Sequence, residues 1–77
     1  MRKIYEIARE ISTDWHKPNY AAVPYIKAMY SLTAIDDKYV FDSGRDIVQR
    51  FLLNAGTWRG DVARRVKAEL RGMVSDV

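Results

Sequence analysis

The sequence predicts an all-α fold, a compact four-helix single domain over residues 1–77 with an aromatic loop between the second and third helices. Three observations favour this fold. Apolar residues recur at helical spacing in four stretches. Proline, glycine and capping residues separate those stretches. The chain is long enough for one domain but not for two, and 48% of its residues are hydrophobic, too many for a disordered segment.

The first helix is expected over residues 2–15. Its apolar side chains fall on one stripe, which comprises Ile4, Ile7, Ala8, Ile11 and Trp15. Pro18 lacks an amide proton and pushes the residue before it out of helical geometry. The helix should therefore end before this proline.

The second helix is expected over residues 23–32, because Pro24 suits a first helical turn. Its buried side should comprise Ile26, Met29, Tyr30 and Leu32. The next segment, "TAIDDKYVFD" at residues 33–42, is predicted to be a loop that packs onto the bundle through its aromatic side chains. A strand is not expected there, because no partner strand is visible in the sequence.

The third helix should begin at Asp42 or Ser43, where Ser43 and Asp46 approximate a capping box. Its inner face should comprise Ile47, Val48, Phe51, Leu52 and Ala55. Asn54 and Gly56 tolerate the left-handed conformation that closes many helices. The fourth helix should be capped by Thr57 and run to about Met73, with an inner face of Trp58, Val62, Val66, Leu70 and Met73.

The stretch "NAGTWRGDVARRVKAEL", residues 54–70, resembles the second half of a DNA-reading helix-turn-helix, with Gly56 in the turn. Two positions disagree with that motif. Leu52 stands where a close helix crossing favours a small residue, and Arg65 stands where a second buried aliphatic residue is expected. Trp58 would lie at the tip that meets bases, yet its spacing indicates an inward anchor. Because of these disagreements, DNA reading by the fourth helix is the alternative function and not the leading one.

A cationic ridge is predicted on the fourth helix, where Arg64, Lys67 and Arg71 fall within roughly 60° of one another. Arg59 and Arg65 should lie elsewhere around the helix, with Arg65 pairing locally with Asp61 and Glu69. The ridge is either a solvated face or a binding site for nucleic-acid phosphates or an acidic protein. The middle of the chain is acidic by contrast, with Asp36, Asp37, Asp42 and Asp46. Such a bipolar surface suits steered protein association or self-association as well as DNA.

Four aromatic residues on or beside irregular segments are expected to be partly exposed: Tyr20, Tyr25, Tyr39 and Phe41. Exposed aromatic residues near charges are typical of protein-binding hot spots, although a loop that seals the bundle is an equally good explanation. The predicted partner-binding residues are Arg64, Lys67, Arg71, Tyr39 and Phe41. A protein partner is expected, with nucleic acid and a homo-oligomer as further options.

No catalytic residue, metal site or cofactor is predicted, and we do not expect an enzyme. The chain has no cysteine, and its single histidine, His16, stands beside Lys17 as a poor general base. "DDKYVFD" lacks the acidic spacing of a calcium loop. The apolar stretches are far shorter than the roughly 20 residues that span a bilayer, and no signal-peptide pattern is present. A cytoplasmic protein with no membrane partner is therefore expected.

Three segments carry a family resemblance: "IYEIAREI", "DSGRDIVQRFL" and "GTWRGDVARRVKAEL". In order and over most of the chain, they are similar to small uncharacterised helical proteins encoded by phages and mobile elements of Gram-positive bacteria. The resemblance transfers no catalytic residue to these positions. It implies an accessory protein that acts by binding a host protein, and inhibitors of host defence nucleases belong to that class.

Overall fold

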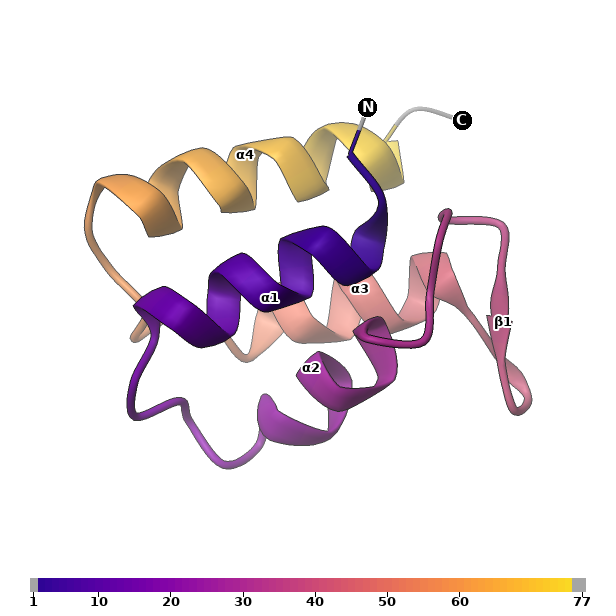
Figure 1. The fold of residues 1–77 in the computed structure, drawn as a ribbon, viewed down its shortest axis with the longest axis horizontal. Helices are drawn as coiled ribbons and strands as arrows, with labels where there is room; N and C mark the ends of the chain where they lie inside the picture. The colour runs from indigo at the N-terminus through magenta and orange to yellow at the C-terminus, as the bar shows by residue number, and fades with distance from the viewer. Residues whose placement is uncertain (1, 76–77) are drawn as a thin grey trace.

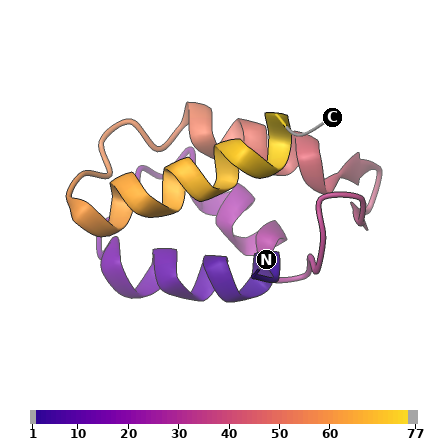
Figure 2. The same ribbon diagram turned by 90° about the horizontal axis from the view of Figure 1, so that it is seen from above.

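The computed structural model describes residues 2–75, which form four helices and one short hairpin (Figure 1). The elements are α1 (Ile4–Asp14), α2 (Val23–Met29), β1 (Lys38–Tyr39), β2 (Asp42–Ser43), α3 (Gly44–Leu53) and α4 (Asp61–Ser75). The main helix contacts join α1 to α2 and α4, and join α3 to the same two helices. Seen from above, α4 lies across α1 and α3 (Figure 2). The mostly helical fold with four helices is confirmed, but the hairpin means that it is not strictly all-α.

The core lies between the four helices, and every helix contributes apolar side chains to it. The predicted stripe of the first helix is confirmed, because its five side chains are all buried. From α3 and its C-terminal end, Ile47, Val48, Phe51 and Ala55 are buried, as are Val66, Leu70 and Met73 from α4. The helical periodicity of the sequence therefore located most of the core.

The second helix is shorter than predicted. Pro24 does lie in its first turn, but α2 ends at Met29, and the amides of Ser31 and Leu32 close tighter turns onto Ala28 and Met29. Tyr30 was expected in the core and is exposed. Its phenol oxygen donates a hydrogen bond to Ser12 Oγ at 2.7 Å. A tyrosine hydroxyl needs such a partner, and this one lies at the surface of α1.

The loop prediction for residues 33–42 is wrong in two respects. β1 and β2 pair antiparallel, with Lys38 opposite Ser43 and Tyr39 opposite Asp42. This pairing could not be predicted, because each strand has only two residues and the second strand is also the capping segment of α3. The aromatic side chains of the segment are exposed rather than packed onto the bundle, and Ile35 packs against the core instead.

Backbone and side-chain hydrogen bonds fix the base of this hairpin. Asp37 Oδ2 accepts from the amides of Thr33 at 2.8 Å and Ala34 at 3.1 Å, while the Asp37 carbonyl accepts from Gly44 N at 2.6 Å. Arg45 N donates to the carbonyl of Ile35 at 3.0 Å. The segment before β1 is therefore tied to the start of α3.

The predicted N-cap of α3 is confirmed, because Ser43 Oγ accepts from Asp46 N at 3.2 Å. The helix ends at Leu53 with Asn54 as its C-cap, close to the predicted end, but the expected left-handed closure is wrong, since Asn54 has a φ of −105° and Gly56 does not have a positive φ. Among residues 2–75, the positive φ values belong to Val40 and Gly60.

α4 begins at Asp61 rather than after a cap at Thr57, so Trp58 lies in the connection of residues 54–60. Trp58 is buried, as its spacing predicted. Its ring stacks on Trp15 with 5.7 Å between ring centroids and meets Phe51 edge-on at 6.3 Å, and its Nε1 donates to Asp14 Oδ2 at 2.8 Å. The chain then turns at Gly60, whose φ of 113° favours glycine, and enters α4.

Ion pairs join α1 to α4, which corrects the expected local pairing of Arg65. Arg65 pairs with Glu10 of α1, and Arg2 pairs with Glu10 at 2.7 Å and with Glu69 at 2.6 Å. The two helices lie close enough for these long side chains to reach across, and such a contact satisfies two carboxylates at once. Hydrogen bonds from Arg65 and Arg2 hold the pKa of Glu10 below its usual value.

Glu10→Gln is expected to lower the free energy of unfolding at neutral pH by up to about 1 kcal/mol, because the pairs are partly exposed. The folded-state pKa of Glu10 is depressed. Its contribution is therefore present above the unfolded-state value of about 4.3 and is lost as pH falls through the folded-state value. Urea unfolding of both proteins across this pH range should show the difference shrinking in acid. A difference that does not change with pH would contradict the assignment.

Candidate functional site: a cationic cleft beside α4

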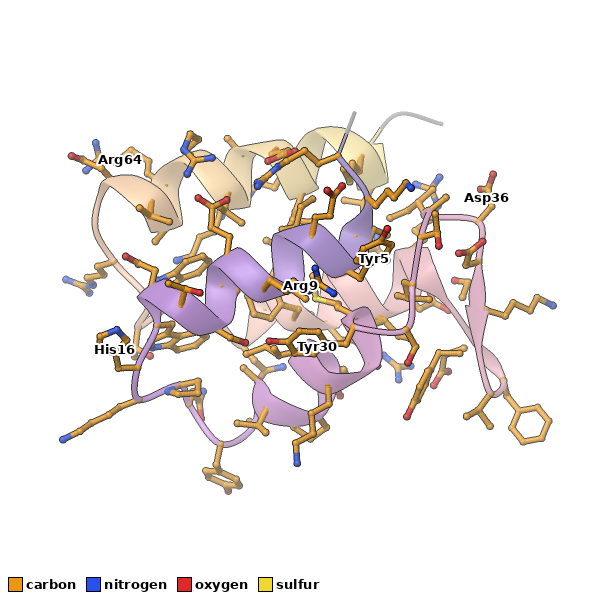
Figure 3. All side chains as sticks on the ribbon, in the orientation of Figure 1. Tyr5, Arg9, His16, Tyr30, Asp36 and Arg64 are labelled. Atoms are coloured by element: carbon orange, nitrogen blue, oxygen red, sulfur yellow. The ribbon has the colours of Figure 1, made fainter. Side chains whose placement is uncertain are left out.

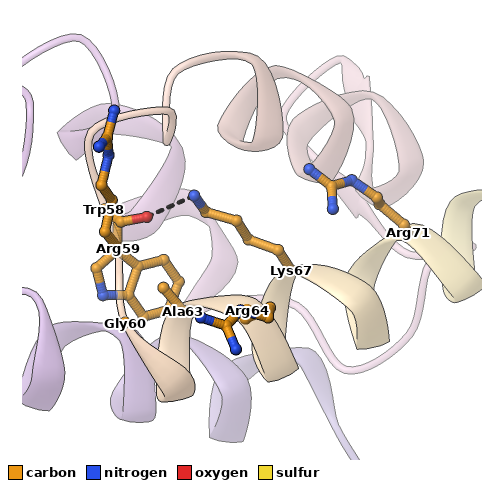
Figure 4. A pocket seen from close by; sticks show the side chains of 7 residues that line it. All are labelled: Trp58, Arg59, Gly60, Ala63, Arg64, Lys67 and Arg71. Atoms are coloured by element: carbon orange, nitrogen blue, oxygen red, sulfur yellow. Dashed lines mark hydrogen bonds between the residues drawn. The ribbon is translucent and has the colours of Figure 1, made fainter.

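A hollow with a volume of about 360 Å³ lies beside the start of α4 (Figure 4). We call it the cationic cleft. It is lined by Trp58, Arg59, Gly60, Ala63, Arg64, Lys67 and Arg71. The three ridge residues predicted from the sequence, Arg64, Lys67 and Arg71, therefore line one site.

Two different elements supply the four cations of the cleft. Arg64, Lys67 and Arg71 repeat at intervals of three and four residues along α4, so they share one face of that helix. Arg59 comes from the connection before α4, and sequence reasoning placed it elsewhere because it assumed a helix from residue 57. Recognising Gly60 as a turn, with α4 starting at Asp61, would have separated Arg59 from the helical face.

Lys67 is the most restrained cation of the cleft. Its Nζ donates to the backbone carbonyl of Trp58 at 2.6 Å and lies 5.9 Å from the centroid of the Trp58 ring. Burial lowers the pKa of Lys67, and the nearby charges of Arg71 and Arg59 lower it further. The Lys67 ammonium is thus held among like charges, which an anion in the cleft would offset.

The cleft has little internal charge compensation. Asp61 Oδ1 lies 3.5 Å from Arg64 Nη1, but both side chains are almost fully exposed, so this pair contributes little. Within the part of the chain that the structure describes, no ion pair involves Arg59, Lys67 or Arg71. By contrast, Arg2 and Arg65 are neutralised by carboxylates of α1 and α4. One face of α4 is therefore a compensated helix contact, and the other carries excess positive charge.

Tyr39 and Phe41 are not part of the cleft. They belong to the hairpin, which projects from the end of the molecule opposite the start of α4 (Figure 1). Figure 3 shows the same separation for Arg64 and Asp36, which lie at opposite ends. The predicted partner-binding residues thus form two separate surfaces, because the hairpin extends away from the bundle instead of folding over it.

His16 lies exposed just beyond the C-terminal end of α1, where its Nε2 is 2.8 Å from the carbonyl oxygen of Thr13. Among residues 2–75, no three histidine or acidic side chains form a group that could hold a metal ion. Over the same residues, no helix has both the length and the apolar character needed to cross a membrane.

The α3–α4 pair departs from helix-turn-helix geometry. Residues 54–60 connect the helices, whereas the DNA-binding motif has a turn of about three or four residues. Trp58, which that motif would place at the tip facing bases, is buried beside Phe51. The exposed face of α4 remains open to phosphate contacts, but not through this motif.

Comparison with protein-family models, with curated proteins and with solved structures gives no match. The fold and the site define a small, mostly helical protein with a cationic cleft at one end and an exposed hairpin at the other.

Proposed function

We propose that this chain is a non-enzymatic binding protein whose cationic cleft docks on an acidic surface of a protein partner. The observation that carries the proposal is the gathering of four cations around one hollow, with the weakly paired Asp61 as the accompanying carboxylate. Bringing like charges together is unfavourable unless an anion compensates them. Carboxylates of a partner supply that compensation, and the fork of an arginine suits them well.

The distribution of charge favours a protein over a nucleic acid. Asp36 lies at the end of the molecule opposite Arg64 (Figure 3), and its segment, residues 36–46, has four aspartates against one lysine and one arginine and is therefore net negative. A partner with patches of both signs would orient such a molecule as it approaches. A nucleic acid is negative along its whole length and would repel the acidic end.

The resemblance to phage and mobile-element proteins suggests the biological setting of this binding. An accessory factor of such an element would act on a host protein, and inhibition of a host defence nuclease is one such role. Nucleases that use metal ions hold them with carboxylates, which form an acidic surface of the kind that the cleft fits. This role is the most specific form of the proposal.

The alternative function is DNA binding by α4. Its support is the alignment of Arg64, Lys67 and Arg71 on one helix face, which spans roughly 10 Å at a rise of about 1.5 Å per residue. Such a row would contact phosphates, and the affinity for duplex DNA would then fall steeply as salt rises.

Reversing two charges of the cleft, in the double variant Arg64→Glu and Lys67→Glu, is expected to abolish partner capture, because the acidic partner would meet like charge. The test is a pull-down from a nuclease-treated lysate of a Gram-positive bacterium, with the bound proteins identified by mass spectrometry. The matched control is the double variant Arg9→Glu and Arg50→Glu, which makes the same net charge change at two exposed positions outside the cleft.

The proposal expects the unmodified protein and the control to retain the same protein, and the cleft variant to lose it. Equal retention by the cleft variant would overturn the assignment of the cleft. Loss from the control as well would show that net charge, not the cleft, governs capture. Salt-sensitive binding of a DNA duplex that disappears only in the cleft variant would favour the alternative.

A further inference from the structure

The tip of the hairpin exposes two apolar side chains. Val40 is 74% exposed and Phe41 is 94% exposed, and both stand between the paired strands β1 and β2. A large apolar side chain so fully in water contributes nothing to the core of its own chain. It does supply the kind of anchor that buries well in a partner.

The backbone of the tip is strained. Val40 has a φ of 59°, a left-handed value that is unfavourable for a β-branched residue and that glycine or asparagine would adopt more easily. Strain of this kind persists only where the surrounding structure enforces it, and it is frequent at binding sites. Here the base of the hairpin is fixed by Asp37 and Gly44. The hairpin therefore presents Phe41 in a fixed position, so little conformational entropy is lost when a partner binds it.

A pocket large enough for a phenyl ring lies elsewhere on the same chain. A pocket of about 270 Å³ opens between the C-terminal part of α1 and α2, lined by Ser12, Trp15, His16, Pro18, Val23, Ile26, Lys27 and Tyr30. A cavity of about 150 Å³ is enough to hold benzene. The pocket can therefore accept one phenyl ring, and its aromatic and aliphatic walls suit such a ring.

We propose that Phe41 of one copy inserts into this α1–α2 pocket of a second copy, which gives head-to-tail self-association. Charge complementarity supports a second copy as the occupant. The segment that carries the tip, residues 36–46, holds four aspartates against Lys38 and Arg45 and so has a net negative charge, while Lys27 lies on the pocket and Lys17 stands beside its residues His16 and Pro18. The self-association is independent of the cationic cleft, which lies beside α4.

The contact must be intermolecular. His16 lies at one end of the molecule, and the hairpin projects from the other (Figure 3). Because tip and pocket are different surfaces, the pair still has one free tip on one copy and one free pocket on the other, and the assembly grows as a chain or closes as a ring. A single ring in a small pocket buries far less than the roughly 1,200 Å² of a stable complex, so the association should be weak and should require high protein concentration.

Sedimentation velocity over a concentration series up to about 1 mM tests the proposal, since weak contacts are populated in that range. The unmodified protein should sediment faster as its concentration rises. Phe41→Ser should weaken the association about tenfold or more, as expected for a central anchor. Leu53→Ser is the matched control, because Leu53 is another exposed apolar residue, on α3 and outside both surfaces, and its loss should change nothing.

A mixing experiment separates tip-in-pocket contact from contact between two tips. Lys27→Trp places a large ring at the pocket and should block it while leaving the tip intact. Each variant alone should stay monomeric, but an equal mixture of Phe41→Ser and Lys27→Trp should form dimers and nothing larger. A circular dichroism melt of Lys27→Trp establishes that it is folded.

Three results would overturn the proposal. The first is an unmodified protein that stays monomeric throughout the concentration series. The second is association that survives in Phe41→Ser. The third is self-association of folded Lys27→Trp alone, which would indicate contact between tips rather than insertion into the pocket.

Discussion

Replacing Trp58 by alanine is expected to lower the free energy of unfolding by about 3–5 kcal/mol. The loss follows from the contacts of a single buried ring, which stacks on Trp15, meets Phe51 edge-on and donates a hydrogen bond to Asp14. A domain of this length has a total stability of roughly 4–12 kcal/mol. The variant should therefore lose a large share of the stability of the fold.

Urea unfolding followed by far-ultraviolet circular dichroism measures this effect without relying on tryptophan fluorescence. Trp58→Phe is the control, because it keeps an aromatic ring but removes the hydrogen bond to Asp14, and it should lose substantially less than the alanine variant. If alanine at position 58 left the unfolding midpoint unchanged, the tryptophan would not be part of the core.

Replacing Gly44 by alanine is expected to destabilise the fold by about 1–3 kcal/mol. A Cβ at this position would lie 2.9 Å from the carbonyl oxygens of both Ala34 and Ile35. These atoms belong to the backbone and cannot swing away as a flexible side chain would. The substitution must therefore displace the segment before the hairpin or the start of α3.

Gly72→Ala is the matched control for this glycine. It lies within α4, and a Cβ there would meet nothing within 4 Å. Alanine forms helices better than glycine, so this variant should gain roughly 0.5–1 kcal/mol. Thermal melts of the two variants should therefore shift in opposite directions. If the melting temperature of Gly44→Ala were at least as high as that of the unmodified protein, a Cβ at position 44 would not clash with the carbonyl oxygens of Ala34 and Ile35.

Helical periodicity predicted the parts of the fold that depend on a long apolar stripe. α1, the inner face of α3 and the inward direction of Trp58 all follow from spacing, because one face of each segment must leave water. The ridge residues Arg64, Lys67 and Arg71 could be placed on one side of α4 by the same geometry. These features need no knowledge of the rest of the chain.

The features that sequence reasoning missed depend on contacts between distant segments. Two-residue strands have no detectable alternation, so the pairing of Tyr39 with Asp42 was invisible. The partner of Arg65 is Glu10, which lies 55 residues away and becomes its neighbour only when α1 packs beside α4. Arg59 lines the cleft because α4 starts at Asp61, after the buried Trp58 and the turn at Gly60, and not at the expected cap Thr57.

The hydrogen bond from Lys67 to the Trp58 carbonyl joins the interior of the protein to its cationic surface. Trp58 both closes the core and lines the cleft, so a molecule that binds the cleft of the folded chain alone must shift the unfolding equilibrium by mass action. At about a hundredfold excess over its dissociation constant, such a ligand adds roughly 2.7 kcal/mol. The melting temperature of this small domain thus reports how far the cleft is occupied, and candidate anions can be ranked by the shift in melting temperature that each causes.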